Sequence, residues 1–183
     1  EHWFAAGTVT AIKPILYARF KQSRPSVKHL KIHFQQQRWN HIVALQAKPV
    51  LNEVEAQQAC EWLFANHRGG LLIQTVVDES ADSFHDEVHA VRNQIRCSAA
   101  KDVKLAILPA IQHLSAKQEA LLHAIISRNS GVTALVIGAD TPASVRQWLQ
   151  RYRDELDLEL IMVKSSCQRE TLATPERAPL QRV

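Results

Sequence analysis

The sequence predicts an α/β protein with a three-layer, mostly parallel sheet, preceded by an N-terminal β-hairpin segment. Two observations lead to this class. From residue 48 onward, apolar runs of strand length alternate with amphipathic stretches of helix length. The apolar runs are nearly continuous, which is typical of parallel strands buried on both faces. Short connections between such elements favour βαβ crossovers, with helices covering both sides of the sheet.

Residues 1–47 are expected to form a β-rich segment, the candidate end of a preceding domain. In the stretch KHLKIHF, residues 28–34, apolar and polar side chains alternate with the period of two of a half-buried strand. A second apolar run, His41–Leu45, follows the polar stretch QQQRWN. The pattern therefore favours two antiparallel strands joined as a hairpin.

The following region, residues 48–166, is predicted to be the α/β domain, and residues 167–183 a tail or linker. Four buried strands are expected at GLLIQTVV, DVKLAILPA, VTALVIGA and LELIMV. Each helix between the strands has its own signal in the sequence. Asn52, three residues before Glu55, is a candidate N-cap, and an apolar stripe predicts a helix over about Ser83–Cys97. Ser115 and Gln118 are spaced as a capping box, and Thr141 is the expected cap before Pro142 at the first helical position.

Composition narrows the function classes. Hydrophobic residues make up 46% and charged residues 22%, as in ordinary globular domains, and no apolar stretch approaches the ~20 residues that span a bilayer. The 3 cysteines lack C-x-x-C spacing, which argues against a disulfide framework or a structural zinc site and favours the cytoplasm. The net charge of +4 is spread along the chain, so no nucleic-acid partner is expected. Because the chain lacks an initiator methionine, we expect a fragment of a longer protein.

Acidic residues at the predicted strand ends raise the alternative of a phosphorylatable receiver domain. Asp78 and Glu79 follow the first of the four strands and Asp140 follows the third. Converging carboxylates could hold Mg²⁺ for phosphoryl transfer. However, Lys164 lies where such a domain needs a hydroxyl, and Asp140 is equally suited to the start of a helix. We therefore predict no catalytic residues, with an enzyme using these three carboxylates as an alternative.

His85 and His89 stand four residues apart, so they share one face of a helix, as zinc ligands of metalloproteases do. The residue after the first histidine is Asp86, whose carboxylate is a methylene shorter than the glutamate that activates water in those enzymes. No third ligand is evident. We predict no metal site here and interpret the histidines, with Arg92 and Arg96, as a cationic column on a solvated face.

Motifs for nucleotide enzymes are absent, with no phosphate loop, no G-x-G-x-x-G and only 5 glycines in the chain. One weak pattern remains. RYRD, residues 151–154, matches the Arg-x-x-Asp signature of cyclic di-GMP sites, in which Arg151 would pair with a guanine edge or phosphate and Asp154 would accept from the guanine amino group. An ordinary helical ion pair of Arg151 with Glu155 or Asp154 explains the same residues.

The middle of the chain resembles the degenerate receiver-like domain of the BcsE family of bacterial cellulose-biosynthesis regulators. The resemblance covers residues 88–149 and is carried by the His-x-x-Arg-x-Gln of HAVRNQ, by LSAKQEALLHA and by VIGADTPASV. The strand pair at residues 26–46, with QQQRW, is similar to the end of that family's inactive NTPase-like domain. The resemblance implies a receiver-like (flavodoxin-like) sheet.

The same resemblance implies a non-catalytic cytoplasmic scaffold that acts through protein–protein contacts in cyclic di-GMP-linked control of cellulose secretion and biofilm formation. It implies other proteins as partners, among them a membrane-bound synthase complex, with self-association also expected, and no cofactor. Where the family carries a second Arg-x-x-Asp on this domain, the present chain has Ser115 and Gln118. Direct binding of cyclic di-GMP through Arg151 and Asp154, or a phosphorylatable receiver, are the alternatives.

Overall fold

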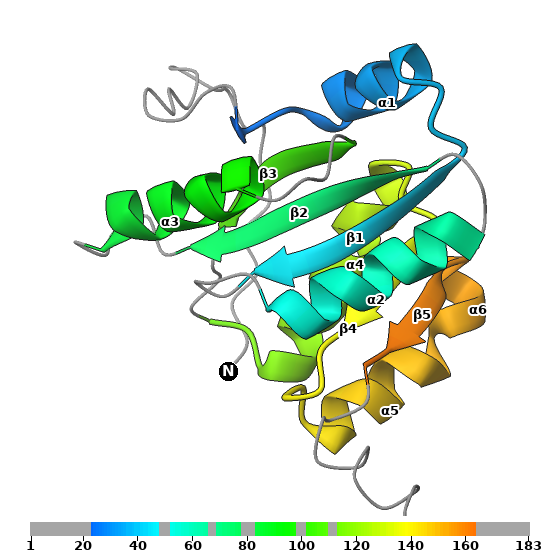
Figure 1. Cartoon of the computed structure of the whole chain (residues 1–183). Helices are drawn as coiled ribbons and strands as arrows, with labels where there is room; N and C mark the ends of the chain where they lie inside the picture. Colours follow the sequence, from blue (N-terminus) through cyan, green and yellow to red (C-terminus); the bar gives the residue numbers. More distant parts are fainter. Residues whose placement is uncertain are drawn as a thin grey trace, which may run out of the picture.

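One parallel sheet organises the chain. The computed structural model describes residues 23–47, 52–65, 69–77, 83–97, 102–109 and 113–163. Within these ranges five strands pair in the order β3-β2-β1-β4-β5, and every pairing is parallel (Figure 1). The strands are β1 (His41–Ala47), β2 (Gly69–Val77), β3 (Val103–Pro109), β4 (Ala134–Ile137) and β5 (Glu159–Met162).

Helices cover both faces of the sheet, which confirms the three-layer α/β class. Successive side chains of a strand point to opposite faces, so Ile42 and Ala44 of β1 face one helix layer, whereas Val43 and Leu45 face the other. The first layer contains α1 (Val27–Gln36), α4 (Ala116–Asn129), α5 (Ala143–Arg151) and α6 (Arg153–Leu156), and the second contains α2 (Glu53–Ala65) and α3 (Phe84–Cys97).

The predicted N-terminal hairpin is wrong. Residues 27–36, expected to be mainly strand, form helix α1, which begins after Ser26, whose side chain accepts from the backbone N–H of His29. The apolar residues at 30, 32 and 34 fit a period of two, but only Leu30 and Phe34, four apart, are buried, while Ile32 is 39% exposed. That spacing is the signature of one helix face. The second predicted strand exists as β1, in the middle of the parallel sheet.

The strand order also corrects the receiver-like expectation. A flavodoxin-like sheet has the order 2-1-3-4-5, whereas the order found here, 3-2-1-4-5, agrees with the first five strands of the classic doubly wound order 3-2-1-4-5-6. The difference lies in which strand is central. With β1 in the middle, the chain winds outward through β2 and β3 and then crosses to β4 and β5 on the other side.

The other element predictions largely hold. The four later strands and the helices between them lie where the apolar runs place them. Ser115 and Gln118 form the predicted capping box, with Ser115 Oγ accepting from the Gln118 backbone and the Gln118 side chain accepting from the Ser115 backbone. At α5 the cap is one residue later than predicted, because Pro142 is the N-cap and makes no side-chain cap hydrogen bond.

The expectations for residues 1–22 and for the tail 167–183 lie outside the described residues, and the domain boundaries stay predictions. Across the described ranges, none of the helices combines the length and the apolar character that crossing a bilayer demands.

Candidate functional site

A cavity of about 430 Å³ opens where the strand order reverses. It lies beyond the carboxyl ends of β1 and β4, which are neighbours in the sheet although β1 also pairs with β2 on its other side. Gln46 comes from the end of β1, and Gly138 follows β4. Ligands of open α/β sheets bind at this kind of switch point, so the fold itself marks the cavity as the candidate site.

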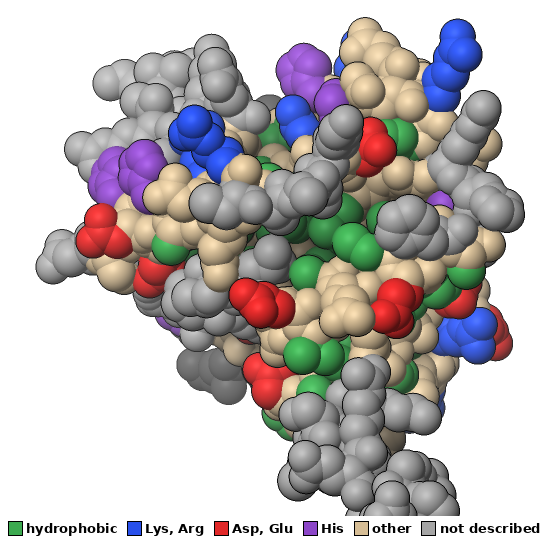
Figure 2. All heavy atoms as spheres, in the orientation of Figure 1, with side chains coloured by type: hydrophobic (Ala, Val, Ile, Leu, Met, Phe, Trp, Pro, Cys, Tyr) green, Lys and Arg blue, Asp and Glu red, His purple; other side chains and the backbone are tan. Residues whose placement is uncertain are grey.

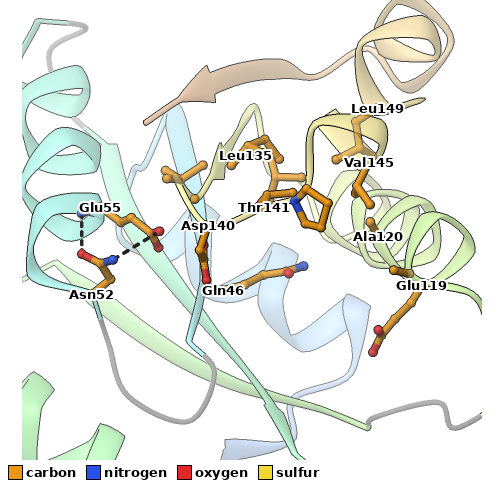
Figure 3. A pocket seen from close by; sticks show the side chains of 15 residues that line it. Gln46, Asn52, Glu55, Glu119, Ala120, Leu135, Asp140, Thr141, Val145 and Leu149 are labelled. Atoms are coloured by element: carbon orange, nitrogen blue, oxygen red, sulfur yellow. Dashed lines mark hydrogen bonds between the residues drawn. The ribbon is translucent and has the colours of Figure 1, made fainter. Parts of the chain in front are cut away.

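The wall on the side of α2 is polar. Asn52 precedes α2, and its Oδ1 accepts from the backbone N–H groups of Val54 at 3.0 Å and Glu55 at 3.4 Å, as the predicted cap requires. Its Nδ2 also reaches Glu55 Oε1 at 3.5 Å (Figure 3). Asp140, from the loop after β4, lies across from Glu55 in the same view. Two carboxylates from segments far apart in sequence therefore share one wall.

Glu55 is the buried carboxylate of the site, at 6% exposed. Desolvation by burial, and then the charge of Asp140, raise its pKa above the ordinary value, while a hydrogen bond from the Ala139 backbone N–H lowers it in part. Gly138 makes this approach geometrically feasible. A Cβ at that position would collide with Glu55 Oε1 and lie 2.7 Å from Asp140 Oδ1, so both carboxylates pass close to the bare backbone.

The opposite wall is apolar. It is built by Leu135 of β4, Ala120 of α4, and Val145 and Leu149 of α5. Figure 3 shows Ala120, Val145 and Leu149 on the side away from Glu55, with the Glu119 side chain beside Ala120. Leu135 and Leu149 are each 2% exposed and belong to the core beneath α4 and α5. The cavity thus has a polar side at α2 and a mainly apolar side, which Glu119 of α4 also borders.

Three helices begin at this edge, because α2, α4 and α5 all contribute lining residues from their first turns or caps. Their N-termini carry the positive ends of the helix dipoles. Glu55 and Glu119 stand in the first turns of α2 and α4, and Asp140 precedes α5. Of the described lining residues, three are carboxylates and none is Lys or Arg.

Of the polar residues predicted at the strand ends, the described structure places one in the cavity. Asp140 lines the cavity, whereas Asp78, Glu79 and Lys164 lie outside the described residues. Gln46 and Glu55 were not predicted as site residues. The end of β1 was overlooked because that strand was assigned to a hairpin, and Glu55 was considered only as part of a helix start.

His85 and His89 lie on α3, away from the cavity lining. On the face shown in Figure 2, histidine and basic side chains lie together over α3, with acidic side chains beside them. Within the ranges that the structure describes, no group of three or more His, Cys, Asp or Glu side chains is placed to hold a metal ion.

Arg151 is the last residue of α5, and Asp154 lies in α6. Both are exposed, and neither lines the cavity. Their predicted role in ligand binding stays a prediction.

Comparison with known proteins identifies the family. Residues 21–171 match the ATP-sulfurylase family. A sulfate adenylyltransferase of Schizosaccharomyces pombe is 28% identical over 140 residues, covering 75% of this chain and 28% of that protein. One from Neurospora crassa is 22% identical over 178 residues, covering 88% and 31%. The chain therefore spans about a third or less of the length of these curated relatives.

A solved structure supports the fold alone. The chain described as the hexameric APS kinase from Thiobacillus denitrificans superimposes with a TM-score of 0.64 at 24% sequence identity, over 84% of this chain and 30% of that one.

These findings overturn the resemblance to BcsE-type regulators. The stretch that carried it, residues 88–149, lies inside the matched range, and its helix starts and strand ends are features that many parallel sheets share. The predictions of a non-catalytic scaffold, of a link to cellulose and cyclic di-GMP, and of a protein that is not an enzyme are wrong on the same ground, since the curated relatives are sulfate adenylyltransferases. With a match running from residue 21 to residue 171, this chain belongs to the ATP-sulfurylase family.

Proposed function

We propose that this chain is the nucleotide-binding part of a sulfate adenylyltransferase. In that reaction a sulfate oxygen attacks the α-phosphorus of ATP, a phosphorus–oxygen bond to sulfate forms, and the bond to the β-phosphate breaks to release pyrophosphate. The observation that carries the proposal is the cavity between the ends of β1 and β4. It lies at the switch point of the sheet and is lined from within the matched range.

The amphipathic walls support a nucleotide as occupant. An adenine ring presents large apolar faces, which suit the mainly apolar side of the lining. A ribose presents hydroxyl donors, which suit the opposite wall. The cavity of about 430 Å³ falls within the range that small-molecule sites occupy, roughly 300–1,000 Å³.

The negative charge of the described lining indicates that groups outside it bind the anionic parts of the substrates. Sulfate and the phosphates of ATP are anions, and the described lining offers Glu55, Glu119 and Asp140 but no Lys or Arg. Carboxylates at close range disfavour such anions. We therefore assign charge neutralisation to basic groups beyond the described lining, and association with further protein segments is part of the proposal. The consumption of ATP also supports the cytoplasmic location expected from the cysteine pattern.

Binding is the direct test. ATP that binds the folded chain must raise its melting temperature, by an amount that grows with ligand concentration. We expect this rise with millimolar Mg·ATP, measured by differential scanning fluorimetry and confirmed by calorimetry. A melting temperature unchanged by ATP, with no heat of binding, would remove the proposal. Catalysis is tested separately, as sulfate-dependent release of pyrophosphate from ATP.

A further inference from the structure

We infer that this chain forms a two-fold symmetric dimer through a surface shared by α1, α4 and α6, so that the partner is a second copy of the chain. The surface surrounds a hollow of about 390 Å³, which residues of all three helices line. It is separate from the cavity at the carboxyl ends of the strands, because the described linings of the two have no residue in common. The inference therefore goes beyond the proposed function and does not depend on it. This α1–α6 surface consists of Val27, Lys31, Ile125, Arg128, Glu155 and Asp157.

The centre of the α1–α6 surface is apolar and open to solvent. Ile125 of α4 is 41% exposed and lines the hollow together with Lys31. Val27, one turn before Lys31 on the same side of α1, is 40% exposed. Single exposed apolar side chains are ordinary, but two of them beside one hollow favour a site of contact with another protein.

The two sides of the surface carry opposite charges. Residues 23–47, which include α1, contain four Lys or Arg and no Asp or Glu, whereas residues 153–159 contain four Asp or Glu and one Arg. Arg128 of α4 pairs with Asp157. Lys31 and Glu155 are both exposed, and within the described ranges the structure gives neither of them an ion pair. The α1 side therefore offers a positive charge to a partner, and the α6 side offers a negative one.

A surface with one basic and one acidic side is complementary to itself. In a two-fold interface both copies contribute the same surface, so Lys31 of one copy lies against Glu155 of the partner subunit, and the reverse pair forms as well. The apolar centre at Ile125 then meets its own counterpart, away from water. An acidic protein or a polyanion would match α1, but Glu155 and Asp157 would repel it. A second copy of the chain satisfies both sides.

Sedimentation equilibrium of the 183-residue chain tests the inference. We expect the average mass to rise from monomer toward dimer as the protein concentration increases, and the dimer to weaken at high salt, which screens exposed charge pairs. Ile125→Asp should raise the dissociation constant of the dimer by at least about tenfold, because it buries an unpaired charge in the interface.

Val54→Asp is the matched control for the apolar centre. Val54 is 39% exposed, close to the value for Ile125, but it lies on α2 in the other helix layer. Its substitution introduces the same charge away from the α1–α6 surface, so the dissociation constant should equal that of the wild type.

The pairing of Lys31 with Glu155 is tested by exchanging the charges. Lys31→Glu and Glu155→Lys should each raise the dissociation constant by about tenfold, because like charges then face each other twice in the dimer. An equimolar mixture of the two variants should recover the wild-type affinity, since one copy then offers two acidic side chains and the other two basic ones. Such recovery also requires that both variants are folded.

Three results would overturn the inference. The first is a wild-type chain that stays monomeric at every concentration, and the second is an Ile125→Asp variant that dimerises as strongly as the wild type. The third is a mixture of the two charge variants that stays monomeric although each keeps the wild-type circular dichroism spectrum. Since the surface lies apart from the cavity, binding of ATP tests the proposed function independently of all three.

Discussion

Ser127 of α4 donates a hydrogen bond from its Oγ to Gln74 Oε1 of β2 at 2.9 Å, and both side chains are buried between that helix and the sheet. Ser127 is 0% exposed and Gln74 is 1% exposed, so neither group can turn to water. The same hydroxyl lies 2.7 Å from the His123 carbonyl oxygen of its own helix. This buried polar contact fixes how α4, which forms part of the cavity wall, sits on the sheet.

Ser127→Ala should therefore destabilise the fold by about 1–3 kcal/mol, because it leaves the buried Gln74 oxygen without this donor. Urea denaturation followed by circular dichroism measures the change. Gln74→Met combined with Ser127→Ala should cost less than the sum of the two single changes, since it removes the stranded acceptor. Strict additivity would show that the two side chains do not depend on each other. Ser144→Ala, at an exposed position of α5, is the control and should have little effect.

Helix α1 is tested by comparing two apolar side chains two residues apart. Phe34 is 3% exposed and stacks on Trp39 with ring centroids 5.5 Å apart, whereas Ile32 is 39% exposed. Phe34→Ala should cost about 3–5 kcal/mol. Ile32→Ala should stay within about 0.5 kcal/mol. Similar large losses for both would instead indicate the alternating strand that the sequence suggested.

Gly138→Ala should disturb the cavity, because the added Cβ meets both carboxylates of the polar wall. We expect a loss of stability of about 1–3 kcal/mol as Glu55 is forced aside. The same substitution made in a Glu55→Ala background should cost less, since the colliding oxygen is gone. Thermal melts of the wild type, the two single variants and the double variant measure these changes in stability. If Gly138→Ala destabilises both backgrounds equally, the strain does not arise from the contact with Glu55.

The raised pKa of Glu55 predicts how stability depends on pH. A carboxyl whose pKa is higher in the folded than in the unfolded state binds its proton more tightly when folded. The contribution of Glu55 to the free energy of unfolding is therefore fully present at pH values below its ordinary pKa of 4.5. It is lost as the pH rises through the raised pKa of the folded state. Glu55→Gln, which stays neutral, should melt higher than wild type near pH 7, and the difference should shrink toward pH 4.

Melting curves across this pH range, with Glu53→Gln as control, measure the effect. The control should follow the wild-type pH profile, because Glu53 is exposed on the first turn of α2. A Glu55→Gln variant that melts lower than wild type at neutral pH would mean that the contacts of the ionised form with Ala139 and Asn52 outweigh its burial.

The class of the fold could be predicted from local patterns, but its topology could not. Continuous apolar runs and capping residues such as Ser115 act within a few residues of themselves, so the later strands and α4 were assigned correctly. Strand order is set by contacts such as Ile42 with Thr133, whose hydroxyl accepts from the Ile42 N–H across 91 residues. No periodicity in the sequence encodes such a pairing.

The candidate site was missed for the same reason. Three apolar residues at 30, 32 and 34 suggested a strand, and with it a hairpin that placed Gln46 outside the sheet. Once β1 is recognised as the central strand, its carboxyl end and that of β4 become neighbours, and Glu55 and Asp140 meet beside Gly138. The resemblance used for function failed because matching helix starts and strand ends describe a parallel sheet rather than one family.

The central place of β1 also affects the way the chain is made. On the ribosome β1 emerges before both of its neighbours, can pair with β2 some thirty residues later, and keeps its other edge open until β4 has been synthesised. During that interval the open edge of a largely apolar strand is available to other nascent chains. We therefore expect slow translation between β2 and β4, or scarcity of chaperones, to lower the yield of folded protein.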